Sequence, residues 1–135
     1  MSALSNIPRH AVLPLGAYDK NGLVRAALQT DQTLLQCDCT AAHDKVSVLA
    51  ALGEGLKLPV HYGRNLDALY DCLTDLKPSD EADRPGFVLL IENLPDVTQL
   101  SADDRSTLLD VFRDAADFFY DHETAFRVFY SVRKT

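Results

Sequence analysis

The sequence predicts an α/β domain in which a small parallel β-sheet of three to four strands packs with helices. Short apolar runs alternate with segments whose apolar residues recur at helical intervals, which favours strands joined by helical crossovers. One run, residues 86–92, is continuously apolar, as is typical of a strand buried on both faces of a parallel sheet. The chain of 135 residues has the size of one domain, so we expect residues 1–135 to share a core.

The N-terminal part of the chain predicts a strand, a helix and a second strand. Residues 11–18 are expected to form the first strand, and residues 33–39, an apolar run with weak alternation, the second. Between them, residues 21–30 have a helical pattern with one apolar face, which consists of Leu23, Val24, Ala27 and Leu28. We expect that face to pack on the sheet.

Two helices are expected next. The apolar side chains of residues 44–58 recur at helical intervals, at Val46, Leu49, Leu52 and Leu56. The second helix, within residues 62–76, has a leucine face made of Leu66, Leu69, Leu73 and Leu76. Asn65 is a good N-cap, because its side-chain oxygen can accept a backbone N–H of the first turn, and Gly63 provides a flexible entry.

The C-terminal part predicts the strand at 86–92, a long helix and a last strand at 125–132. Ser101 stands three residues before Asp104, a variant of the capping-box pattern, so the long helix is expected to begin there and to run to about residue 121. Its apolar face consists of Leu108, Leu109, Phe112, Ala115, Ala116 and Phe119. Each crossover between parallel strands should be right-handed.

The charge of the chain limits its partners. Lys and Arg number 13 and Asp and Glu number 20, for a net charge of −7. This balance argues against nucleic acid and against anionic membranes, and it fits a basic protein. No apolar run approaches the roughly 18 residues of a membrane span, and the N-terminus does not have the pattern of a signal peptide.

The residues that could support catalysis do not form a recognised pattern. His61 lies near Asp67 and Asp71 in the sequence, but no zinc-binding histidine pair and no glycine-rich phosphate loop is present. We therefore expect no enzyme activity, no metal and no cofactor. The odd number of cysteines, Cys37, Cys39 and Cys72, suits reduced, buried thiols in a cytoplasmic protein.

The helix within residues 62–76 carries three aspartates along one side. Asp67, Asp71 and Asp75 follow at i, i+4 and i+8 with no Lys or Arg between them. Aspartate is a poor helix former, each like-charge pair repels by about a few tenths of a kcal/mol, and Asp75 is placed against the helix dipole. A solvated face is the simplest interpretation, but an acidic face kept at a cost to stability indicates a binding partner.

A second acidic stripe lies on the long helix, at Asp110, Asp114, Asp117 and Asp121. Its spacing points it directly away from the face that contains Leu108, Phe112 and Phe119, as a plain solvated face would be. Only Arg113, between two of the aspartates, offers local compensation. The stripe fits a solvated face and a binding surface equally well.

The segment from Leu58 to Leu76, LPVHYGRNLDALYDCLTDL, resembles the barstar family of inhibitors of barnase-type ribonucleases. The matching pattern is a proline, a loop that ends Tyr-Gly-X-Asn, and then Leu-Asp-Ala-Leu-aromatic-Asp-Cys-Leu. Residues 111–115, VFRDA, match the family pattern Val-Phe-Arg-acidic-Ala. The order of elements agrees from about residue 33 to residue 132, and residues 1–32 look like an N-terminal extension with an extra strand and helix.

The resemblance implies a cytoplasmic inhibitor, monomeric when free, that blocks the basic active site of an extracellular-type ribonuclease with an acidic helix and the loop before it. Asp71 matches the family's anchoring acid, Asp67 and Asp114 match supporting charges, and Tyr70 matches an interface aromatic. The resemblance also implies contacts or loop-shaping roles for Tyr62, His61, Gly63, Asn65 and Leu66.

Two residues depart from the family pattern. His61 stands where the family most often has an aromatic residue, and Arg64 places a positive charge between Gly63 and Asn65. A positive charge on this surface does not suit a basic enzyme. An immunity or adaptor-type binding module of the same fold, which recognises a different basic protein, is therefore the alternative.

Overall fold

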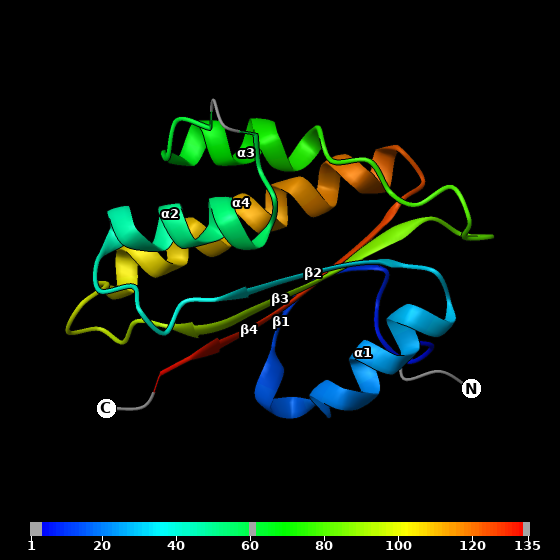
Figure 1. The fold of residues 1–135 in the computed structure, drawn as a ribbon, viewed down its shortest axis with the longest axis horizontal. Helices are drawn as coiled ribbons and strands as arrows, with labels where there is room; N and C mark the ends of the chain where they lie inside the picture. Colours follow the sequence, from blue (N-terminus) through cyan, green and yellow to red (C-terminus); the bar gives the residue numbers. More distant parts are fainter. Residues whose placement is uncertain (1–3, 60–61, 134–135) are drawn as a thin grey trace.

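The computed structural model describes residues 4–59 and 62–133, and at its centre is a four-stranded sheet with the strand order β1-β4-β3-β2 (Figure 1). The elements follow as β1 (His10–Pro14), the 3-10 helix η1 (Leu15–Ala17), α1 (Lys20–Gln29), β2 (Thr33–Asp38), α2 (Lys45–Gly55), α3 (Leu66–Thr74), β3 (Gly86–Leu94), α4 (Ala102–Asp121) and β4 (Ala125–Val132). Neighbouring strands are parallel in every pair. The predicted α/β class with a small parallel sheet is confirmed.

Helices cover both faces of the sheet (Figure 1). On one face, α1 packs through Leu23 and Ala27 onto Leu90 of β3. On the other face lie α2, α3 and α4, whose buried side chains, such as Leu52 of α2 and Phe112 of α4, form the larger part of the core. The sheet is therefore the middle layer of a three-layer sandwich.

The burial of β3 explains its continuously apolar sequence. Phe87, Leu89 and Ile91 face α2, α3 and α4, while Val88 and Leu90 face α1. All five side chains are at most 1% exposed. Because successive side chains of a strand point to opposite faces, a strand covered on both sides cannot alternate apolar with polar residues.

Two of the apolar faces expected from the sequence differ from those in the structure. Val46 is 66% exposed, and Val48, 1% exposed, takes its place against the sheet. Leu28 is 63% exposed, whereas Ala26 is buried. In both helices the side chains available at helical spacing allow more than one buried face, and packing against the sheet selects between them.

The ends of the helices follow their capping residues. Asp44 and Ser47 form a capping box at the start of α2, with Asp44 accepting from the Ser47 N–H at 2.8 Å. Ser101 accepts from the Asp104 N–H at 3.1 Å, as predicted for the long helix. The first strand is shorter than expected, since β1 ends at Pro14 and η1 begins at the next residue.

The cysteines are buried free thiols. Cys37 and Cys39 lie on and just after β2 with their Sγ atoms 3.7 Å apart, and the Cys37 thiol donates to the Ala51 carbonyl of α2 at 3.3 Å. Cys72 lies on the buried side of α3. Their burial agrees with the expectation from the sequence.

We predict that Gly55→Ala destabilises the fold. Gly55 ends α2 against β2, and a Cβ at this position would lie 2.7 Å from the Cys37 Cα, a backbone atom that cannot move away independently. Such overpacking costs about 1–3 kcal/mol. Urea unfolding measures the loss. Gly16→Ala is the matched control, because the methyl group added there would have no atom within 4 Å of it; equal stability of the two variants would contradict the prediction.

Candidate functional site

Asn65 determines where α3 begins. Its side-chain oxygen accepts the Ala68 N–H at 2.8 Å, so the predicted N-cap is confirmed. The cap leaves Asp67 in the first turn, where the helix dipole favours a negative charge. α3 ends at Thr74, and Asp75 is its C-cap residue.

The turn before α3 uses Arg64, and not Gly63, for its left-handed backbone conformation. Arg64 has φ of 53°, and no described glycine has a positive φ. The left-handed position of the turn therefore falls on Arg64, one residue after the glycine that the sequence predicted as a flexible entry. Gly63 instead permits a close approach, because a Cβ there would lie 3.2 Å from the Asn65 side-chain nitrogen. The exposed Arg64 carries the backbone strain of the turn.

Tyr62 is turned largely into the protein. Its ring packs on α2 so closely that a Cβ on Gly53 would lie 2.9 Å from it. Its hydroxyl oxygen is buried without a hydrogen-bond partner, and burial raises the pKa of Tyr62 to about 12. The structure thus gives this side chain a packing role that the sequence did not indicate. His61, the neighbouring candidate, lies outside the described residues.

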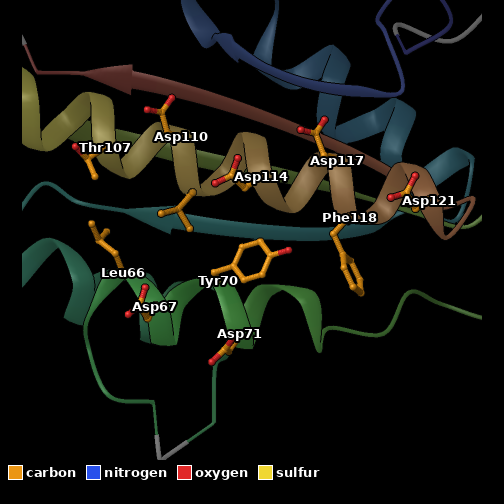
Figure 2. A pocket seen from close by; sticks show the side chains of 11 residues that line it. Leu66, Asp67, Tyr70, Asp71, Thr107, Asp110, Asp114, Asp117, Phe118 and Asp121 are labelled. Carbon is orange, nitrogen blue, oxygen red and sulfur yellow. The ribbon is translucent and has the colours of Figure 1, made fainter.

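A groove of about 960 Å³ separates the exposed sides of α3 and α4. Figure 2 shows Leu66 and Tyr70 reaching from α3, and Phe118 from α4, into the space between the two helices. These side chains and Val111 are partly buried and line the groove, so they form an apolar floor. The tyrosine and phenylalanine rings are therefore accessible to a partner that enters the groove.

The rim of the groove is acidic. Six aspartates line it, and all are exposed: Asp67 and Asp71 from α3, and Asp110, Asp114, Asp117 and Asp121 from α4. The stripe on α4 is exposed, as expected, and borders the same groove as the aspartates of α3. In Figure 2, Asp110 and Asp117 point away from α3 and Asp71 points away from α4, so these carboxylates lie along the two outer edges of the groove. The packing of α3 on α4, which brings the two stripes together, is a long-range contact that helical spacing does not reveal.

Little of this charge is neutralised. Arg113 donates to the Asp110 carboxylate at 2.8 Å, the one ion pair at the groove within the described part of the chain. Asp75, the third acid of the ladder on α3, is exposed but does not contribute to the groove. Of the candidates from the sequence, the groove brings together Leu66, Asp67, Tyr70, Asp71 and Asp114, whereas Asn65 and Gly63 shape the turn that precedes α3.

The described residues contain neither a candidate metal cluster nor a candidate membrane helix. In residues 4–59 and 62–133, no group of three or more His, Cys, Asp or Glu side chains is placed to hold a metal ion. The same residues contain no helix with the length and apolarity needed to cross a membrane. The site is an exposed, acidic groove with aromatic side chains on an α/β scaffold.

Comparison with known families agrees with this geometry. The family model described as Barstar (barnase inhibitor) matches residues 32–131. The chain belongs to the Barstar family, a family of inhibitors, as the resemblance of residues 58–76 indicated. A comparison with curated proteins found no match.

We predict that Tyr62→Phe removes part of the loss of stability at high pH. The folded state holds the pKa of Tyr62 at about 12, against an ordinary value of 10.0. The unfolded chain therefore loses this proton first, so the contribution of Tyr62 to stability is complete below about pH 10 and falls as the pH rises toward 12. Near neutral pH the phenylalanine variant should be as stable as the wild type, because the Tyr62 hydroxyl makes no hydrogen bond that the substitution would remove.

Urea unfolding at about pH 8 and about pH 11 checks this expectation. Tyr120→Phe is the control, because Tyr120 is 68% exposed on α4. A Tyr62→Phe variant that loses as much stability between the two pH values as the control would show that the hydroxyl is not enclosed.

Proposed function

We propose that this protein is an intracellular inhibitor of a barnase-type ribonuclease and blocks the basic active site of the enzyme with α3 and the loop before it. The observation that carries the proposal is the groove rimmed by exposed aspartates in a chain that belongs to the Barstar family. The proposed inhibitor acts as a monomer, since its binding face has to be free.

The chemistry of the ribonuclease site supports this proposal. An enzyme that cleaves RNA holds a polyanion with clustered Arg, Lys and His side chains, so carboxylates on a helix can take the place of phosphates. Arg–carboxylate hydrogen bonds are charge-assisted and often bidentate, which adds geometric specificity. Opposite net charges also accelerate association, and they do so less at high ionic strength.

In this proposal Asp71 is the central anchor, and Asp67 and Asp114 are supporting charges. The three carboxylates line one groove from two helices, and none forms an ion pair within the described residues. They are therefore available to a cationic partner without first breaking an internal contact. Tyr70 and Leu66 would supply contact area on the floor of the groove, next to the anchor.

The loop has a different part in the proposal. Asn65 and Gly63 hold the turn through the cap and the close approach described above, so they orient α3 without needing to touch the enzyme. For Tyr62, the hydroxyl is buried, so a contact with the enzyme would have to come from the rest of this partly exposed side chain. His61 stays a proposed contact on the basis of its place in the sequence.

The N-terminal residues precede the part of the chain that matches the family. We propose that residues 1–32 extend the same domain. β1 pairs with β4 from His10 to Pro14, and α1 packs on the sheet face opposite the groove. This arrangement leaves the proposed binding face uncovered.

The alternative is an immunity or adaptor-type module that recognises a different basic protein. The observation that favours it is Arg64, an exposed positive charge held in a left-handed turn directly before the acidic helix. A basic enzyme that docks on this turn would meet a like charge, whereas a partner with an acidic residue beside its basic patch would not.

We predict that Asp71→Ala abolishes tight inhibition. Removing one partner of a buried, hydrogen-bonded charge pair costs about 3–5 kcal/mol, which corresponds to roughly a 100-fold or greater rise in the inhibition constant. The measurement is cleavage of RNA by a barnase-type ribonuclease titrated with the wild type and the variant.

Asp75→Ala is the matched control for this experiment. It removes the same charge from the same helix, at the C-cap and outside the groove, and should change the inhibition constant by less than about threefold. Stoichiometric inhibition by a folded Asp71→Ala protein would exclude Asp71 as the anchor. Failure of the folded wild type to inhibit at all would favour the alternative module.

We predict that the outer acids of α4 act mainly on the rate of association. Asp117 and Asp121 lie at the rim and have no ion-pair partner among the described residues, so they steer a basic partner through the solvent. The double variant Asp117→Asn and Asp121→Asn should associate several-fold more slowly than the wild type at low salt. The two association rate constants should become equal at about 1 M salt. Stopped-flow association kinetics measure this, and an equal effect at both salt concentrations would contradict it.

A further inference from the structure

A second hollow, of about 360 Å³, lies at the end of the sheet where the strands begin. Its walls include three arginines, Arg9, Arg84 and Arg127, and no carboxylate is among the described residues that line it. In a chain with a net charge of −7, a hollow with only positive charged side chains is unusual. It is separate from the acidic groove, since no residue lines both.

Arg127 is the central residue of this hollow. It is only 8% exposed, near the start of the apolar strand β4, where it follows Phe126 and precedes Val128. Its Nη2 donates to the Ile7 carbonyl at a long 3.4 Å, and its Nε is buried without any partner. A buried cation with so little compensation is costly, and proteins normally pair such a charge.

The surroundings of Arg127 do not compensate its buried positive charge. None of the three arginines forms an ion pair within residues 4–59 and 62–133. Burial lowers the pKa of Arg127, and the nearby positive charge of Arg9 lowers it further. Arg9 and Arg84 are exposed and also border a neighbouring hollow that contains Asp83 and Glu123, so Arg127 is the cation that most needs a counter-ion.

Gln32 also lines this hollow, and one of its polar atoms is unsatisfied. Its Nε2 donates to the Arg84 carbonyl at 2.9 Å, while its Oε1 is buried and accepts no hydrogen bond. This oxygen lies against Gly86, where an added Cβ would overlap it, so it is enclosed by protein and does not reach into the hollow. The charged groups of the hollow are therefore all donors, and phosphate oxygens accept charge-assisted hydrogen bonds from guanidinium groups.

We propose that this hollow binds a phosphate group, either free phosphate or a small phosphate monoester, with Arg127 and Arg9 as its cationic ligands. Arg84, which is exposed, contributes further positive charge to the site. The site involves the N-terminal segment and the start of β4, so an occupied site ties residues far apart in the chain to one ligand. It is independent of the proposed inhibition of a ribonuclease.

Isothermal titration calorimetry of the full chain tests this proposal. Inorganic phosphate and phosphoserine are titrated separately, with chloride at matched ionic strength as the reference, so the two arms distinguish a free phosphate from an esterified one. Arg127→Gln and Arg9→Gln should each weaken the binding of whichever probe binds by about tenfold or more, because each removes a charge-assisted hydrogen bond. Arg25→Gln, which removes an exposed arginine of α1 outside the hollow, should bind as the wild type does.

Thermal unfolding provides a second readout. Phosphate should raise the Tm of the wild type and of Arg25→Gln relative to chloride, and should not raise the Tm of Arg127→Gln. If Arg127→Gln fails to fold, Arg9→Gln decides the question, because Arg9 is exposed. Binding of neither probe by the wild type, or unchanged affinity in the folded arginine variants, would overturn the proposal, whatever the outcome of the ribonuclease assay.

Discussion

The structure depends on the burial of the two central strands, β3 and β4, on both of their faces. Parallel strands need crossover connections, and a sheet with no solvated face needs helices in front and behind. Once α1 covers one face, α2, α3 and α4 have to share the other, and α3 has to pack on α4 to fit there. The acidic groove is a consequence of this packing, because it lies where α3 and α4 run side by side on the outside of the domain.

The same constraint explains why the groove combines opposite kinds of side chain. Leu66, Tyr70, Val111 and Phe118 lie at the boundary between the core and the solvent, so they are apolar and yet reachable. The aspartates lie on the neighbouring, solvent-facing side of each helix, where their carboxylates are hydrated. The groove therefore has negative charge along its edges and apolar and aromatic surface on its floor.

Much of the fold follows from local sequence signals, and the differences have a physical reason. The cap at Asn65, the cap at Ser101 and the apolar face of α4 were all predictable, because each depends on residues within a turn or two of one another. Val46 and Leu28 were assigned to the core wrongly, because a helix with several apolar residues has more than one possible buried face and the sheet decides between them.

The meeting of the two acidic stripes and the hollow around Arg127 depend on contacts between distant segments. The hydrogen bond from Arg127 to Ile7, for example, spans 120 residues. No periodicity within a helix or strand reports such a contact. An arginine inside the apolar run 125–132 was nevertheless a visible signal that this strand borders something other than plain core.

The separation between the groove and the core has a consequence for the evolution of the family. The six aspartates of the rim are exposed, and the side chains that hold α3 and α4 in place, such as Leu69, Leu73 and Phe112, are fully buried. Substitutions at exposed positions usually change stability by less than about 0.5 kcal/mol. If the proposed inhibition holds, such a protein can follow a drifting enzyme by exchanging charges along two helices, while selection on folding acts on a different set of residues.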